Sequence, residues 1–230
     1  MVLYGRQAVR EALRAGRRPV REVWATARAA REPWLAGARV HVVEAHEVER
    51  RAGSPDHQGV CAQAGAFPYA DPDALLAVPD GLLVALDEVQ DPQNLGAVCR
   101  TAEAAGAAGV VLPERRSALV TPAACKASAG AVEHLPVALV RNLADFLAQA
   151  KARGSWCYGA DAAAPTRYDD VDLRGRVVLV LGAEGKGLRP RVARACDVLV
   201  SLPLRGRVAS LNVSATAAVL LYGAVRTREP

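Results

Sequence analysis

From residue 81 onward, short apolar runs alternate with longer segments in which apolar residues recur every three or four positions. The run at 177–181, Val-Val-Leu-Val-Leu, contains no polar residue, which is typical of a strand buried on both faces. The pattern predicts strands over residues 82–86, 109–112, 135–140, 156–159, 177–181 and 198–202. It predicts helices over residues 94–105, 122–129, 143–153, 188–195 and 210–226. This alternation predicts an α/β domain built on a mostly parallel sheet.

The beginning of the chain predicts a smaller α/β unit. Its first helix has one apolar stripe, formed by Ala8, Val9, Ala12 and Leu13. Strands are expected over residues 20–25, 39–43 and 59–64, and short helices over 5–15 and 45–51. The next segment has two prolines between 65 and 73 and no apolar period, so it is interpreted as a linker with a short helix over 73–78. We therefore expect an N-terminal domain over 1–64, a linker over 65–80 and a C-terminal domain over 81–230.

Composition narrows the class of protein. Of the 230 residues, 51% are hydrophobic, which is enough for packed cores and excludes general disorder. No apolar stretch reaches the ~18 residues that a membrane helix needs. The first residues contain Arg6, Arg10 and Glu11 where a signal peptide needs an apolar run. We expect a soluble, cytoplasmic protein.

The cysteines and histidines do not predict a metal site or a disulfide framework. There are five cysteines, an odd number, and none forms a CxxC pair. Most are surrounded by Ala and Val and are interpreted as small core residues. The four histidines are scattered along the chain, at His41, His46, His57 and His134.

Positive charge is concentrated in the first quarter of the chain. Residues 1–53 contain eleven basic and six acidic side chains, so they supply the whole excess of +5. Such a concentration indicates a module that contacts a polyanion such as RNA, and arginine is well suited to phosphate. Two other interpretations stay open: a solvated helix face, and a GC-rich genome that favours arginine codons.

The loop after the strand at 82–86 leads into a helix with two candidate polar residues. Asn94 is expected as an N-cap or first-turn residue. Arg100 lies off the apolar stripe of this helix, and Gly96, one turn earlier, is expected to leave space beside it. On spacing alone, an ion pair with Glu103 explains Arg100 better than a ligand contact does.

Two further loops follow predicted strands. Glycines surround Glu184 in the sequence Gly-Ala-Glu-Gly-Lys-Gly at 182–187, which fits neither the P-loop nor the dinucleotide fingerprint. Glu184 either orients a polar ligand or caps a helix. Ser210 is expected as the N-cap of the last helix. Asn212 is unusual in a first helical turn, which suggests a polar side chain directed at a ligand site.

In this order and at these spacings, the three loops resemble the motifs of the SpoU (TrmH-type) RNA 2′-O-ribose methyltransferases of the SPOUT superfamily. The resemblance covers the C-terminal domain, including the segments at 128–131 and 134–137. The N-terminal segments at 5–13 and 57–60 resemble the ribosomal-protein-like substrate-binding domain of members that modify large-subunit ribosomal RNA.

The resemblance implies an α/β-knot domain with a C-terminal trefoil knot, working as a homodimer. It implies S-adenosylmethionine as methyl donor, bound through the backbone at Gly182, Leu202 and Leu211, and no metal. The implied catalytic residues are Arg100, Asn94, Glu184, Ser210 and Asn212. Arg100 would act on the ribose hydroxyl, either as a base or electrostatically, and the others would position the ribose and the donor.

The implied function is 2′-O-methylation of a guanosine in 23S ribosomal RNA. One alternative is methylation of transfer RNA or another RNA, and a second is a non-catalytic RNA-binding protein of the same fold. A Rossmann oxidoreductase is a weaker alternative, because the glycine fingerprint is missing.

The last predicted helix adds an expectation about assembly. Residues 210–226 are apolar on nearly every side, with Leu220 among them. Since one sheet covers only one side of a helix, we expect a second copy of the chain to cover the other. The alternative is a neighbouring helix of the same chain.

Overall fold

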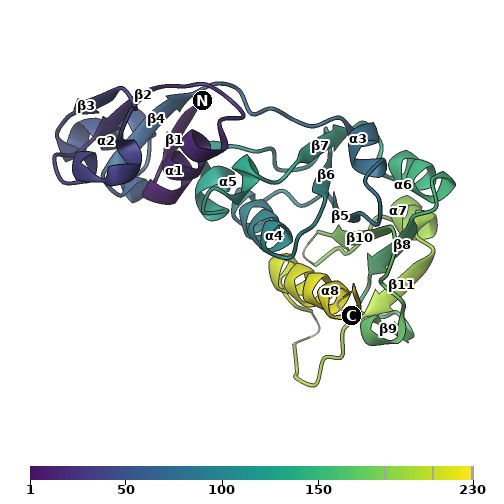
Figure 1. Cartoon of the computed structure of the whole chain (residues 1–230). Coiled ribbons are helices and arrows are strands. Elements are labelled where there is room, and N and C mark those ends of the chain that lie inside the picture. Colours follow the sequence, from purple (N-terminus) through teal and green to yellow (C-terminus); the bar gives the residue numbers. More distant parts are fainter. Residues whose placement is uncertain (184, 209, 229–230) are drawn as a thin grey trace.

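The computed structural model describes residues 1–183, 185–208 and 210–228, and it contains two separate sheets. A four-stranded sheet has the order β1-β4-β2-β3, and a seven-stranded sheet has the order β7-β6-β5-β10-β8-β11-β9. Figure 1 shows the smaller sheet and its helices at the left and the larger sheet at the right.

The small sheet forms the N-terminal domain. Its strands are β1 (Val2–Tyr4), β2 (Val20–Ala25), β3 (Val40–Val42) and β4 (Val60–Ala64). Strand β4 pairs antiparallel with β1 and β2, and β3 is parallel to β2. The helices are α1 (Arg6–Ala15) and α2 (Ala45–Ala52). Ala8, Val9 and Ala12 of α1 are buried, as its predicted stripe requires. Strand β1 was not predicted, because three residues are too few to show a period.

All pairings in the large sheet are parallel. Its strands are β5 (Leu82–Asp87), β6 (Gly109–Pro113), β7 (Val137–Val140), β8 (Trp156–Ala160), β9 (Thr166–Arg167), β10 (Val177–Gly182) and β11 (Val198–Ser201). The six predicted strands are present, and β9 is an additional edge strand. Strand β10 lies between β5 and β8 and is buried on both faces, as its continuous apolar run predicted.

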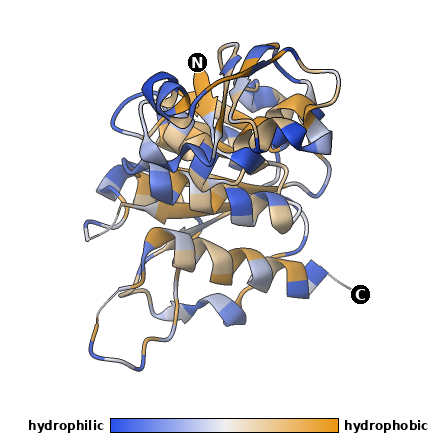
Figure 2. Cartoon of the chain, turned by 90° about the vertical axis from the view of Figure 1, so that its left-hand side faces the viewer, coloured by the Kyte–Doolittle hydropathy of each residue, from blue (hydrophilic) through white to orange (hydrophobic). Residues whose placement is uncertain are grey.

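Helices cover both faces of the large sheet. They are α3 (Pro72–Leu76), α4 (Pro92–Ala104), α5 (Pro122–Ala127), α6 (Leu143–Ala152), α7 (Pro190–Ala195) and α8 (Val213–Arg228). Alternate residues of β5, β6, β7, β8 and β10 enter two separate cores: one contains the inner faces of α4 and α8, and the other those of α6 and α7. Figure 2 shows hydrophobic colouring on the strands and mixed colouring on the helices that border them.

Two helices begin at different residues than predicted. Helix α4 begins at Pro92, and its N-cap is Asp91, whose carboxylate accepts a hydrogen bond from the Gln93 N–H. Helix α8 begins at Val213, and the Asn212 side chain accepts from the Ser214 N–H. A carboxylate or amide oxygen just before the helix satisfies a free backbone donor, so Asp91 and Asn212 cap these helices. Asn94 lies in the first turn of α4, one of the two places predicted for it, whereas Ser210 precedes α8 and does not cap it as predicted.

The segment between the two sheets is packed against the large one. Phe67 is buried, and the Ala70 N–H donates to the Val137 carbonyl at 2.8 Å. Leu75 and Leu76 of α3 are buried as well. A chain that started at residue 79 would therefore lose part of the C-terminal domain's own core.

A buried ion pair joins the two domains. Arg18 of the N-terminal domain is 5% exposed, and Glu133, between α5 and β7, is 1% exposed. The Arg18 Nε donates to Glu133 Oε2 at 3.1 Å, and its Nη2 binds the other carboxylate oxygen. The Gly65 carbonyl accepts from Arg18 Nη1 at 3.2 Å, so the guanidinium also fastens the connecting segment.

Two more contacts border this pair. His134 Nε2 lies 2.8 Å from Glu11 Oε2, and Lys126 Nζ donates to the Asp56 carbonyl at 2.7 Å. One hydrophobic core runs through both domains and includes Val9 on one side and Leu95 on the other. The N-terminal domain is therefore a fixed part of the molecule.

We predict that Arg18→Met destabilises the protein by about 3–5 kcal/mol, because it leaves the buried Glu133 carboxylate without its counter-charge. The double variant Arg18→Met/Glu133→Leu is expected to recover most of this loss. Urea denaturation followed by circular dichroism measures both. The control is Arg174→Met, which breaks an exposed pair and should cost less than about 1 kcal/mol. Equal losses in the single and double variants would contradict the prediction.

Candidate functional site

The loops after β5 and β10 are joined by a buried carboxylate. Asp87, the last residue of β5, has no exposed surface. It accepts hydrogen bonds from the backbone N–H and the Nε of Arg189, both at 2.8 Å. The pKa of Arg189 is raised, first by its hydrogen bond to Asp87. Since Arg189 immediately precedes α7, this contact fixes the end of the glycine-rich loop against β5.

The glycine-rich loop after β10 is tightly folded. A Cβ added at Gly182 would lie 2.2 Å from the carbonyl carbon of Gly187. The Gly187 N–H donates to the Ala183 carbonyl at 2.9 Å, which closes the turn. Only glycine fits at position 182, because the backbone of the same loop occupies the place that a side chain would take.

Two predicted site residues, one in the first turn of α4 and the other just before α8, are in contact. Asn212 Nδ2 donates to Asn94 Oδ1 at 3.0 Å. The Asn212 Oδ1 atom accepts from the Ser214 N–H at 2.8 Å and from its hydroxyl at 2.6 Å. The amide of Asn212 therefore has a fixed orientation, and it ties the last helix to the loop after β5.

A cavity of about 420 Å³ lies at the carboxyl ends of β10, β8 and β11. Its wall includes Gly182, Leu202 and Leu211, the three residues expected at the donor. Ser210 also lines it. Leucine, alanine and glycine make up most of its lining, a combination that suits a flat heterocycle with polar edges.

A smaller cavity of about 220 Å³ adjoins the first. Asn94 lines it, and Ala183, Lys186 and Val213 line both cavities. Glu88 also belongs to its wall. One Glu88 oxygen is buried without a hydrogen-bond donor among the described residues, 3.5 Å from Arg116 Nη1 and 3.7 Å from Arg189 Nη1.

Arg100 does not join this group. It is exposed on α4, lines neither cavity and has no hydrogen bond or ion pair with the described part of the chain, Glu103 included. The expectation that Gly96 makes room for Arg100 was wrong. A Cβ at Gly96 would lie 2.5 Å from the Cβ of Ala127 and 2.7 Å from the Ala124 carbonyl, so this glycine permits the close contact of α4 with α5. Glu184 lies outside the described residues.

The sequence analysis missed the pair formed by Asp87 and Arg189. A signal was present, since Asp87 is a charged residue directly after an apolar strand, but its partner is 102 residues away. It also missed Lys186 and Asp161, which line the larger cavity. Among the described residues, no group of His, Cys, Asp and Glu could hold a metal ion, and no helix is long and apolar enough to cross a membrane.

Two protein families match the chain, one for each domain. The family described as SpoU rRNA Methylase matches residues 81–222. The family described as RNA 2'-O ribose methyltransferase substrate binding matches residues 2–70.

Individual proteins agree with these matches. A protein of Bacillus subtilis named as a TrmH family tRNA/rRNA methyltransferase is 45% identical over 179 residues, which are 76% of this chain and 72% of that protein. A tRNA/rRNA methyltransferase of Mycolicibacterium vanbaalenii is 43% identical over 84% of this chain, which spans only 63% of that relative. The crystal structure of the SpoU methyltransferase AviRb from Streptomyces viridochromogenes, in complex with AdoMet, has a TM-score of 0.83 and 25% identity, covering 98% of this chain and 89% of that one. That neighbour has the SPOUT fold that the sequence resemblance implied.

We predict that Gly96→Ala destabilises the protein by roughly 1–3 kcal/mol, because the new methyl group meets the backbone of α5. Gly206→Ala is the matched control, since a Cβ there has no atom within 4 Å, and its effect should stay below about 0.5 kcal/mol. Urea denaturation compares the two. Equal stability of the two variants would mean that α4 moves freely relative to α5.

Proposed function

Because the chain belongs to the SpoU rRNA Methylase family, we propose that it is an S-adenosylmethionine-dependent RNA 2′-O-ribose methyltransferase acting on a guanosine of 23S ribosomal RNA in the cytoplasm. The observation that carries the proposal is the larger cavity beside the Asn94–Asn212 contact. The substrate-binding family match of the N-terminal domain supports an RNA acceptor. The AdoMet bound to the neighbour AviRb supports the donor.

The larger cavity fits the proposed donor in size and chemistry. Leu202, Leu204 and Leu211 offer apolar surface for the adenine faces, and backbone groups at Gly182 and its neighbours suit the adenine edges. Leu204 is 37% exposed and Leu211 is 44% exposed, so both side chains offer apolar surface that a bound donor would bury. S-adenosylmethionine supplies a methyl group that its positively charged sulfur has already activated.

The remaining task of the protein is to prepare the ribose hydroxyl, which is a weak nucleophile. Asn94 and Asn212 already hold each other in one orientation, so they can bind the ribose without a large loss of side-chain entropy. Ser210 and Glu184 are proposed to complete this group.

Arg100 is proposed to act on the acceptor RNA. A guanidinium keeps its proton at neutral pH and is a poor base, so electrostatic polarisation of the hydroxyl or binding of the adjacent phosphate is the better role. Its exposed position on α4, outside both cavities, agrees with a contact to RNA.

The proposal includes a homodimer through α8. Leu220 and Leu221 are buried within the single chain, where α8 packs against α4 and β10. The neighbouring helix α4 therefore covers part of the apolar surface of α8 that was predicted to contact a second copy. An exposed stripe remains, in which Val219 is 37% and Tyr222 is 53% exposed. This stripe is the surface proposed for the second copy.

The activity is tested by incubating the protein with labelled S-adenosylmethionine and deproteinised ribosomal RNA, then digesting the RNA and identifying the labelled nucleoside. We expect 2′-O-methylguanosine in the large-subunit RNA. Label in transfer RNA only would favour the alternative acceptor, and absence of label from every RNA would favour a binding protein without activity.

We predict that Arg100→Ala lowers methyl transfer by about 10²–10³-fold, because one electrostatic contact to the reacting group is lost. Donor affinity, measured by calorimetry, should change less than about twofold. Arg194→Ala is the control, an exposed arginine on α7 with no ion pair among the described residues. Transfer at the wild-type rate in Arg100→Ala would remove this residue from the mechanism.

For the dimer, we predict that Val219→Glu/Tyr222→Glu yields monomers in light scattering at micromolar concentration, since it places charges on the exposed stripe. Its melting temperature should stay close to that of the wild type, because both side chains are exposed in the single chain. A wild-type mass of one chain would contradict the proposal directly.

A further inference from the structure

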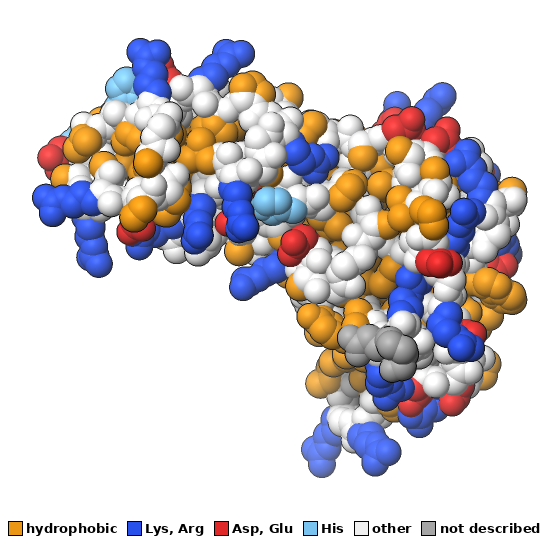
Figure 3. All heavy atoms as spheres, in the orientation of Figure 1, with side chains coloured by type: hydrophobic (Ala, Val, Ile, Leu, Met, Phe, Trp, Pro, Cys, Tyr) orange, Lys and Arg blue, Asp and Glu red, His pale blue; other side chains and the backbone are white. Residues whose placement is uncertain are grey.

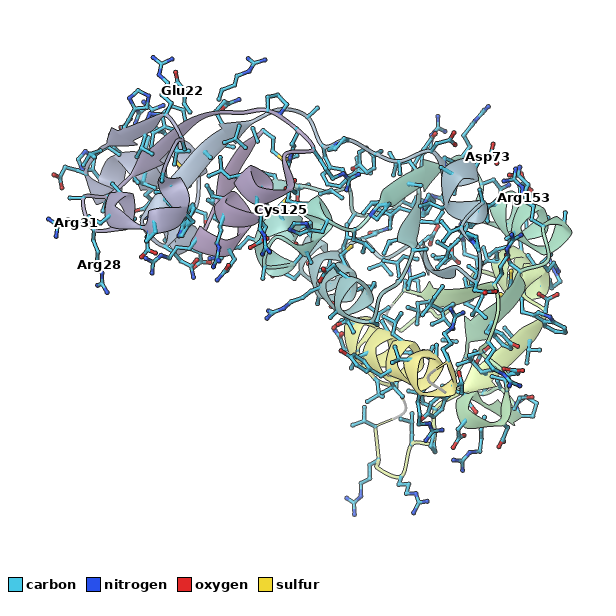
Figure 4. The ribbon with its side chains drawn as sticks, viewed as in Figure 1. Glu22, Arg28, Arg31, Asp73, Cys125 and Arg153 are labelled. Carbon is cyan, nitrogen blue, oxygen red and sulfur yellow. The ribbon has the colours of Figure 1, made fainter. Side chains whose placement is uncertain are left out.

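Four arginines at the surface of the C-terminal domain are neutralised by aspartates. The ion pairs are Arg153–Asp73, Arg167–Asp169, Arg174–Asp172 and Arg191–Asp145, with N–O distances between 2.6 and 2.8 Å. Figure 4 labels one of these pairs, Arg153 and Asp73. Such pairs leave little net charge for a polyanion to bind.

The arginines of the loop between β11 and α8 differ from these four. Arg205 and Arg207 are exposed and have no hydrogen bond or ion pair with any described residue. Residues 202–228, the loop and α8 together, contain no Asp or Glu at all. Figure 1 shows the loop before α8 projecting from the body of the molecule, and Figure 3 shows basic side chains at the same end.

The same loop forms a wall of the larger cavity. Leu202, Leu204 and Leu211 line the cavity, on either side of the two arginines in the sequence. The loop therefore has a charged part in solvent and an apolar part against the donor site. A ligand that holds the arginines would also hold the leucines in place.

We propose that this loop is an RNA contact that couples acceptor binding to donor binding: Arg205 and Arg207 bind phosphates of the RNA, and the bound RNA holds the leucine wall over the donor. This inference rests on the proposed function and names a surface and a regulation of the same site. Guanidinium groups bind phosphate oxygens through paired, charge-assisted hydrogen bonds. By thermodynamic linkage, the donor must raise the affinity for RNA by the same factor.

RNA fits this surface better than an acidic protein segment does. The arginines flank a glycine on a projecting loop, and Val208, next to them, is 74% exposed, so the described residues beside the arginines offer a peptide little packed apolar surface. Arg28 and Arg31, at the far end of the N-terminal domain, are likewise exposed and without an ion pair among the described residues (Figure 4). Cations free of carboxylates at both ends of one rigid molecule suit a long polyanion.

The test compares Arg205→Ala/Arg207→Ala with Arg167→Ala/Arg174→Ala, which removes two exposed arginines that have aspartate partners. Binding of deproteinised large-subunit ribosomal RNA to the full-length protein is measured between 50 and 200 mM salt. The first variant should bind more weakly, and its salt dependence should be shallower by roughly 1.4–1.8 in slope, the value for two lost phosphate contacts. The control should keep the wild-type slope, and Arg205→Lys/Arg207→Lys should keep most of it.

Donor affinity is measured in the same proteins by calorimetry, with and without the RNA. In the wild type we expect the RNA to raise donor affinity about fivefold or more, the usual range of coupling between two sites. The alanine variant should bind the donor alone as the wild type does and should lose the increase.

Several outcomes would overturn the inference. One is an unchanged salt slope in the alanine variant. Another is a loss of donor affinity that is equal with and without RNA, because the loop would then contribute to the donor site independently of RNA. Conversion of this variant to monomers would assign the loop to the partner chain. Failure of the proposed function is distinguishable, because the wild type would then bind RNA with the expected slope and transfer no methyl group.

Discussion

The buried carboxylate of Asp87 is the contact on which the geometry of the site depends. It receives the backbone and the guanidinium of Arg189, so the end of β5 and the beginning of α7 cannot separate without leaving a charge uncompensated in the core. The glycine-rich loop runs from Gly182, which pairs with Asp87, to Arg189, so both of its ends are held at the end of β5. Asn94 lies on α4, the helix that follows Asp87 in the chain. The contact between Asn94 and Asn212 then places the beginning of α8 relative to both loops.

The order of the strands determines where the two cavities and the N-terminal domain lie along the sheet. The larger cavity lies at the ends of β10, β8 and β11, and the smaller one lies where β5 meets β10. The N-terminal domain is attached farther along, at α5 and the turn that contains Glu133, through a buried ion pair and a shared core. The order in which the parallel strands are placed therefore also fixes the order of the proposed donor site, the proposed acceptor side and the N-terminal domain.

The elements of the large sheet could be predicted from the sequence because buried parallel strands are continuous apolar runs. The exact ends of α4 and α8 could not, because Asp91 and Asn212 each compete with other polar residues within three positions for the capping role. Asn94, Ser210, Gly182, Leu202 and Leu211 surround two adjoining cavities, which only the motif resemblance had suggested. The role predicted for Gly96 was wrong because this glycine is required by the close contact with the neighbouring helix α5, which the local sequence does not reveal. The partners of Arg18 and Asp87 lie more than 100 residues away from them in the sequence. Long-range polar contacts leave no period in a sequence.

The central position of β10 also constrains how the chain folds. Val177 pairs with Leu82, so the middle of the sheet joins segments that are 95 positions apart, and β8 finds its inner neighbour only when β10 enters. Until then β5 exposes the edge of the half-sheet β7-β6-β5, β8 has no strand partner, and α4 lacks the cover of α8. Contacts of such high sequence separation carry a large loop-closure entropy and slow the folding of parallel sheets. During synthesis the N-terminal domain can form early, whereas this half-sheet stays open and prone to aggregation until the last third of the chain has left the ribosome.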